Sequence, residues 1–300
     1  MLCASAGDLR AFERTQTCDP SGRFACEPDE SPKPIAWPVR CVEYRINERG
    51  SDQFASGDDA KIGDRLRNLV GDSFEAWNAP SCSDLQLVEG ELTDEDRARV
   101  VRSGGVAANT NIVVWRDDDW PRRNNRYAFA LTSVSYDSST GEIKDADIEI
   151  NSETYDFKDF GDSKVDETQK IDLRNTLTHE VGHFVGLAHT AEADATMYGS
   201  ATAGEIEKRT LERDDIDGLC AAYPAGDSPT TCRDESDFLP ADAGGRRADA
   251  GSGQPGGGRG GSGCSSAGSD PTGGLPLTPL VLALLVSPAL CLLRRRTRRS

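Results

Sequence analysis

Apolar residues follow two different periods along the middle of the chain, between Pro34 and Cys232. Val42, Tyr44 and Ile46 alternate with polar residues, which is the pattern of a strand with one buried face. After the polar Ser56-Gly57-Asp58, the spacing becomes helical and predicts a helix of about twenty residues. The apolar positions of that helix are Ile62, Leu66, Leu69, Val70, Phe74 and Trp77.

Four further strands are predicted from short apolar runs bounded by polar or turn-forming residues. They cover residues 84–88, 111–115, 131–136 and 146–150, and residues 137–141 form a turn between the last two. Most strands come before the remaining helices, and no internal repeat is visible. This order predicts one compact α+β unit.

The end of the chain has a different composition. Residues 243–274 are mainly Gly, Ser, Asp and Pro, which cannot bury a core and predict a flexible spacer. Residues 275–293 carry no charge for nineteen positions, and five arginines follow within the last seven residues. That length just spans a bilayer, with the arginines on the cytoplasmic side. Pro276, Pro279 and Pro288 disfavour a permanent helix, so a transient sorting signal competes with a lasting anchor.

Cysteine usage indicates an oxidising compartment. Of nine cysteines, Cys3, Cys264 and Cys291 lie in the terminal segments. The other six are scattered without a Cys-x-x-Cys pair, which predicts three disulfides among Cys18, Cys26, Cys41, Cys82, Cys220 and Cys232. Fifteen connectivities are open. Closeness in sequence favours Cys18/Cys26 and Cys220/Cys232, which leaves Cys41/Cys82.

The first residues carry part of an export signal. Ala4-Ser5-Ala6 has the small-x-small form of a signal cleavage site, although no basic region or long apolar stretch precedes it. We interpret residues 1–8 as the remnant of a signal peptide, and a chance triplet is the alternative. The formal charge of −17 repels phosphate backbones and excludes nucleic acid as a partner.

The chemistry is concentrated in one segment, which holds all three histidines of the chain: Thr178-His179-Glu180-Val181-Gly182-His183-Phe184-Val185-Gly186-Leu187-Ala188-His189. On a helix, His179 and His183 lie one turn apart on the same face and reach one ion, with Glu180 beside it. Gly186 can adopt a left-handed conformation that ends the helix and brings His189 round as a third ligand. Three protein ligands leave the fourth position of Zn²⁺ for water.

This motif predicts a zinc endopeptidase in which Glu180 is the general base. The alternative is that these histidines lie on an ordinary amphipathic helix. His-Glu-x-x-His alone often has this explanation, but Gly186 and His189 at these offsets argue against it. Another alternative is a surface protein that binds peptides without cutting them, but mere binding does not require Glu180. Hydrolysis of a different amide, such as a cell-wall peptide, stays open.

The long form of the motif resembles that of the metzincins, and residues 37–223 resemble the matrixin branch, the family of the matrix metalloproteases. Ala195-Thr196-Met197-Tyr198 matches the Met-turn, with Met197 beneath the zinc site, and residues 211–223 are similar to the last helix. The resemblance implies a zincin fold: a twisted mixed five-stranded sheet, two long helices, an active-site helix, and a small C-terminal subdomain with one helix.

Further site residues follow from the same resemblance. Ser133, Val134 and Ser135 correspond to the antiparallel edge strand, against which a protein or peptide substrate would lie extended. Calcium is a weaker expectation, since a solvated acidic turn explains the same residues; its candidate ligands are Asp137, Asp145, Asp147 and Glu153.

The chain departs from the matrixin pattern in three ways. No histidine is left for a second, structural zinc. The cysteine switch is missing, because Pro38-Val39-Arg40-Cys41 runs directly into a strand. Gly199 stands where proline commonly follows the Met-Tyr pair, which predicts a different pocket wall behind the zinc.

The last forty residues are similar to the C-terminal sorting tail of myxobacterial surface proteins: Gly263-Cys264-Ser265, an apolar span and an arginine block. The resemblance implies a processing enzyme that acts near Cys264, a membrane contact that is at least transient, and a secreted or surface-anchored product. We therefore expect a monomer with an N-terminal Cys-containing segment (9–33), a catalytic domain (34–233), a linker (234–262) and a sorting tail (263–300).

Overall fold

The computed structural model describes residues 12–19, 25–54, 63–98, 110–120, 127–161, 170–226, 232 and 238, and the backbone of residues 277–286. Its centre is a mixed sheet in the order β2-β1-β3-β5-β4-β9-β8. β2, β1, β3 and β5 are parallel neighbours, and β4 runs antiparallel to β5. The bounds are β1 Cys41–Ile46, β2 Gln86–Glu89, β3 Ile112–Trp115, β4 Ala128–Asp137, β5 Ile143–Ile150, β8 Ser200–Ala201 and β9 Leu277–Val286.

The predicted α+β fold with five mixed strands is confirmed by β2, β1, β3, β5 and β4. Two strands that the sequence did not predict, β9 and β8, extend this sheet beyond β4. A separate pair, β6 Asp156–Lys158 and β7 Lys170–Asp172, runs parallel just before the second helix.

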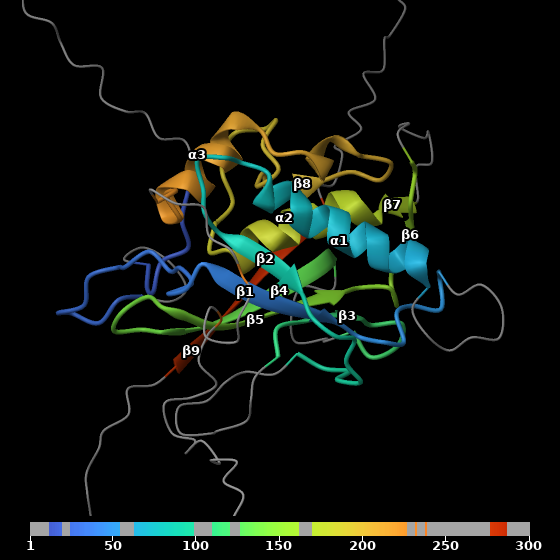
Figure 1. Ribbon diagram of the computed structural model, residues 1–300, viewed down its shortest axis with the longest axis horizontal. Coiled ribbons are helices and arrows are strands. Elements are labelled where there is room, and N and C mark those ends of the chain that lie inside the picture. Colours follow the sequence, from blue (N-terminus) through green and yellow to red (C-terminus); the bar gives the residue numbers. More distant parts are fainter. Residues whose placement is uncertain are drawn as a thin grey trace, which may run out of the picture.

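Helices α1 Asp64–Asn78 and α2 Leu173–Phe184 lie side by side over one face of the sheet, and α3 Arg213–Ala222 lies apart at one end (Figure 1). A short 3-10 helix, η1, spans Glu207–Arg209. The described part of α1 has 15 residues, and its periodic apolar face is buried as predicted. Trp77 at its end donates from Nε1 to the Thr178 oxygen at 2.8 Å, which fixes α1 against α2.

The N-terminal residues pack on the same unit. The Thr15 amide donates to the Gly186 oxygen at 3.0 Å, and the Ala188 amide donates to the Glu13 oxygen at 3.0 Å. The Thr15 hydroxyl also donates to the Leu187 oxygen at 3.1 Å. The described part of residues 9–33 therefore supports the loop that leads to His189.

Three disulfides join the six predicted cysteines, but two of the predicted pairings are wrong. Cys18–Cys26 is the local pair expected, whereas the other bonds are Cys41–Cys232 and Cys82–Cys220. The reason is that the chain after α3 returns alongside the start of β2, where the Asp84 amide donates to the Tyr223 oxygen and the Ala225 amide to the Cys82 oxygen. Cys41 is thus bonded, so Pro38-Val39-Arg40-Cys41 offers no free thiol to a metal.

Within the described residues, no helix is both long enough and apolar enough to cross a membrane. Of the predicted apolar span 275–293, only residues 277–286 are described, and they form strand β9 of the main sheet. Residues 1–8 and the triplet at Cys264 lie outside the described residues, and so does Ile62 at the predicted start of α1.

Candidate metal centre

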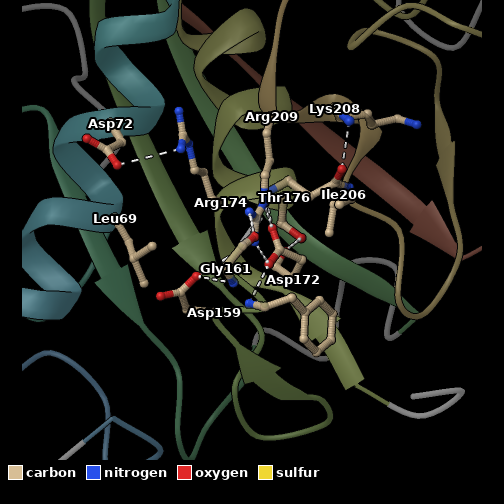
Figure 2. Close-up of polar contacts among 12 residues, drawn as sticks. Leu69, Asp72, Asp159, Gly161, Asp172, Arg174, Thr176, Ile206, Lys208 and Arg209 are labelled. Carbon is tan, nitrogen blue, oxygen red and sulfur yellow. Dashed lines mark hydrogen bonds and ion pairs between the residues drawn. The ribbon is translucent and has the colours of Figure 1, made fainter. Parts of the chain in front are cut away.

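Helix α2, which carries the first two histidines, is fixed at its start by a buried acid. Strand β7 ends at Asp172, whose carboxylate caps the helix by accepting from the Asn175 amide at 2.8 Å. The Arg209 guanidinium donates to both oxygens of the same carboxylate, one of them at 2.7 Å. Figure 2 shows the Arg209 side chain reaching Asp172, with Gly161 and Asp159 beside it. This buried ion pair ties α2 to η1, which follows the Met-turn.

The three imidazoles converge through their Nε2 atoms. His179 Nε2 lies 3.2 Å and His183 Nε2 lies 3.0 Å from His189 Nε2. The other ring nitrogens face backbone oxygens: His179 Nδ1 is 2.6 Å from the Thr196 oxygen and His183 Nδ1 is 2.8 Å from the Leu187 oxygen. An Nδ1–H that donates to a carbonyl leaves the Nε2 lone pair free for a metal.

These separations fit a zinc ion. A tetrahedral ion with Zn–N bonds of about 2.0–2.1 Å places its ligand nitrogens about 3.3 Å apart, close to the two distances observed. Among the described residues, His179, His183 and His189 are the one set of three or more His, Cys, Asp or Glu side chains with ligand atoms within 4.8 Å of one another. The set is therefore suited to a catalytic zinc with three protein ligands.

A sharp turn brings His189 to the helix. Gly186 has φ +89°, the left-handed conformation that the sequence predicted. A Cβ at this position would lie 2.7 Å from the Ile35 oxygen, so close backbone packing adds a second reason for glycine. The Gly186 amide donates to the His183 oxygen at 2.9 Å and the Leu187 amide to the Gly182 oxygen at 2.9 Å, which closes the helix end.

Met197 lies against α2 at Gly182. A Cβ on Gly182 would be 2.1 Å from Met197 Sδ and 2.8 Å from Trp77 Cζ2, so only glycine fits between the helix and the Met-turn. The turn is held from below by Asp215, whose carboxylate accepts the Thr196 and Met197 amides at 2.8 and 2.9 Å. Sequence reasoning missed both Gly182 and Asp215, because each role depends on a contact between distant segments.

Gly199 lies against His189, one of the predicted metal-binding residues, rather than in a remote wall of the pocket. A Cβ at Gly199 would lie 2.7 Å from His189 Nδ1. The glycine therefore lies directly beside the third imidazole, and its effect on the shape of the pocket stays a prediction.

Glu180 is buried and faces β4, which is not the edge strand that the sequence predicted, because β9 pairs with its second side. The Thr132 hydroxyl of β4 donates to Glu180 Oε2 at 2.5 Å and lies 3.1 Å from the Glu180 backbone oxygen. Thr132 was not among the predicted site residues, although it directly precedes the predicted Ser133. Alternation places Ser133 on the opposite face, and the core residues Ala130 and Val134 on either side of Thr132 in the alternation were the available signal.

Burial keeps the three imidazoles neutral. Desolvation, followed by the neighbouring imidazoles, holds the pKa of His179 and His183 well below its usual value. Desolvation, followed by the charge of Lys208, lowers the pKa of His189 to about 4. Neutral imidazoles are the form that binds a metal.

The four predicted calcium ligands are not brought together among the described residues. Asp145 and Asp147 are buried on β5, and the Ile112 amide donates to Asp147 at 3.0 Å. Asp137 accepts from the Ser139 amide and hydroxyl at the β4–β5 turn, whereas Glu153 accepts from the Trp120 amide after β5. The two outer residues thus lie at opposite ends of β5.

A cavity of about 530 Å³ adjoins the Met-turn on the side of β8. Its lining includes Tyr198, Ser200, Ala201, Glu205 and Lys208. The predicted edge residues Ser133, Val134 and Ser135 lie in the middle of β4, where the Val134 side chain is in the core.

Comparisons with known proteins agree with this geometry. The family model described as Matrixin matches residues 103–224. The chain is 41% identical to interstitial collagenase of Bos taurus over 63 residues, which is 21% of this chain and 13% of the collagenase. It is 36% identical to Metalloendoproteinase 2-MMP of Arabidopsis thaliana over 64 residues, and 31% identical to matrilysin of Homo sapiens over 71. These matches cover 21% of this chain, and 17% and 27% of the relatives. Residues 103–224 of the chain are therefore similar to the matrixin family, and the chain spans less than a third of the length of each of these relatives.

Proposed function

We propose that the chain carries a catalytic domain of the matrixin family and is a zinc-dependent endopeptidase that cuts extracellular proteins. The observation that carries the proposal is the convergence of three imidazole Nε2 atoms beside the buried carboxylate of Glu180. Histidines 179, 183 and 189 would hold the ion. When bound, zinc supplies a Lewis acid that polarises the scissile carbonyl and lowers the pKa of a bound water to about 7.

Glu180 would accept the proton of the attacking water and pass it to the leaving amine. The Thr132 hydroxyl supports this role because its hydrogen bond orients the carboxylate before substrate arrives. Met197, Gly182 and Gly186 would keep the ligands in place through the contacts described above. The backbone of β4 around residues 133–135 would bind an extended peptide by strand addition.

The proposed compartment is outside the cytoplasm. Three disulfides persist where thiols are oxidised, and a Cys41–Cys232 bond closes most of the chain into one loop. Delivery to the cell surface and processing near Cys264 remain predictions from the resemblance of the tail. The purified protein is expected to be a monomer.

The test is incubation of the purified chain with a degenerate peptide library, before and after removal of residues 241–300. We expect internal cuts that a chelator abolishes and added zinc restores. Zinc binding without cleavage in either form would contradict the endopeptidase proposal and favour a module that only binds peptides. Cleavage that persists without metal would contradict it as well.

A further inference from the structure

Strand β4 would leave a long open edge if the sheet ended there. It spans Ala128–Asp137, and β5 covers one of its two sides. The other side would present a row of unpaired N–H and C=O groups, which readily captures another extended chain. Thr132 of this strand contacts the Glu180 carboxylate, so a chain paired here would lie beside the predicted metal site.

The occupant of this edge is a distant piece of the same chain. β9, Leu277–Val286, runs antiparallel to β4 from Asp137↔Leu277 to Ala128↔Leu285. On its other side, β9 pairs in parallel with β8 through Ser200↔Leu285 and Ala201↔Val286. Figure 1 shows β9 as the red strand running along β4. The pairing extends along the whole of β4.

The register places β9 opposite the residue of β4 that contacts Glu180. Leu282 lies opposite Thr132, the residue whose hydroxyl contacts the Glu180 carboxylate. On the other side, β8 begins directly after Gly199, which contacts the His189 ring. Neighbouring strands lie about 4.8 Å apart, so a second peptide cannot pair with β4 at Thr132 while β9 is there.

We infer that residues 277–286 are an internal strand ligand that occupies the substrate edge and holds the enzyme closed to peptides. The inference rests on the proposed function and gives its site a means of regulation. The partner that fits this surface is an extended, uncharged, leucine-rich segment, and the chain supplies it as Leu277-Thr278-Pro279-Leu280-Val281-Leu282-Ala283-Leu284-Leu285-Val286.

The sequence of the segment suits an edge strand better than a membrane helix. Pro279 breaks a helix, but a strand tolerates proline where one side lacks a neighbour. Among the described strands, β8 pairs with β9 only at Leu285 and Val286, so β4 is the one described strand beside Pro279. An apolar strand with open edges is prone to aggregation, and the pairing of β9 with β4 covers one edge of each strand.

Because β9 belongs to the same chain as β4, even a weak interaction between them can keep the site occupied. Fifty residues separate Gly226 from Leu277, enough to span well over 100 Å when extended. A segment joined to its own binding site by a short linker meets that site at an effective concentration of about 1 mM, which falls as the linker lengthens. If the free strand bound with a dissociation constant of about 0.1 mM, roughly one site in ten would stay open. Removing the strand would then raise activity about tenfold.

The experiment uses the full zinc-loaded chain with Leu282→Pro, which removes a backbone donor at the centre of β9. Leu292→Pro is the matched control, since it makes the same change in the apolar tail beyond β9. The first measurement is kcat/KM on a short quenched peptide. The second is hydrogen exchange of the β4 amides, with Glu180→Gln added to every protein to prevent self-cleavage.

We expect Leu282→Pro to raise kcat/KM about tenfold and to speed amide exchange in β4, while Leu292→Pro matches the parent chain. If Leu282→Pro speeds β4 exchange but none of the proteins cuts peptide, the inference of an internal strand ligand is supported and the proposed peptidase function is rejected. Unchanged exchange in β4 would overturn the inference. The inference would also be overturned if the parent chain and both variants bound phosphatidylcholine vesicles equally while their β4 amides exchanged rapidly. That result would assign residues 277–286 to a lipid surface.

Discussion

The two sides of the metal site are built from different kinds of sequence. One side is the histidine segment, residues 179–189, where helix geometry and a single left-handed glycine bring three ligands together. The other side is the edge formed by β4, β9 and β8, whose strands come from three distant parts of the chain. The metal-binding residues are therefore specified by one short segment, whereas the access of a peptide to them depends on pairing between distant strands. Substitutions can change metal binding and peptide access separately.

The largest expected effect separates chemistry from metal binding within the histidine segment. Glu180→Gln should lower kcat/KM about 10²- to 10⁴-fold and retain zinc, because the amide cannot accept the proton of water. Peptide hydrolysis and elemental zinc should be measured on the same sample. Glu75→Gln, an exposed position on α1, is the control and should leave both values unchanged. Loss of zinc in the Glu180→Gln variant would show that Glu180 has a structural role instead.

The next effect tests whether the histidine segment depends on its buried support. Arg209→Met leaves the Asp172 carboxylate buried without its ion pair and should cost about 3–5 kcal/mol of unfolding free energy. Urea unfolding provides the measurement. Arg213→Met breaks an exposed ion pair with Asp217 and should cost less than about 1 kcal/mol. Equal costs would mean that Arg209 does not anchor α2.

These contrasts explain what the sequence could and could not predict. Both the helix that carries His179 and the turn at Gly186 follow from residues a few positions apart, and α1 and β1 follow from simple periodicity. The pairing of Thr132 with Leu282 joins residues 150 positions apart, and nothing in either segment specifies the partner. Two predicted disulfide pairings are wrong for the same reason. Closeness in sequence favoured Cys220/Cys232, but the chain after α3 returns beside β2, and Cys220 bonds to Cys82 instead.

A smaller effect should appear with pH. The pKa of His189 is lowered to about 4 in the folded chain, against about 6.5 when unfolded, so protons bind the unfolded chain more tightly. The stability that neutral His189 contributes to the metal-free protein is therefore fully present above about pH 6.5 and is lost as the pH falls toward 4. His189 should contribute a loss of up to about 2 kcal/mol by pH 5.

Urea unfolding of the metal-free chain at pH 7 and pH 5 gives this difference directly. His189→Asn should reduce it, because the variant lacks one of the titrating groups. A difference that stays the same in His189→Asn would contradict the assignment to this imidazole.

The smallest expected effect concerns zinc affinity after substitution of Gly199, which lies between His189 and the start of β8. Gly199→Ala adds a Cβ 2.7 Å from His189 Nδ1 and should weaken zinc binding about tenfold by displacing the ring. Competition with a chromogenic chelator measures the affinity. Gly63→Ala, where a Cβ meets nothing within 4 Å, should leave it unchanged. An unaltered affinity in Gly199→Ala would show that the ring adjusts without loss.

The central claim is that His179, His183 and His189 together hold one zinc ion with an open fourth position. X-ray absorption of the zinc-loaded chain tests it most directly. We predict three imidazole nitrogens at about 2.0–2.1 Å and one light oxygen ligand, with one imidazole lost in His189→Ala. A thiolate sulfur at about 2.3 Å, or a coordination shell unchanged in His189→Ala, would contradict the account.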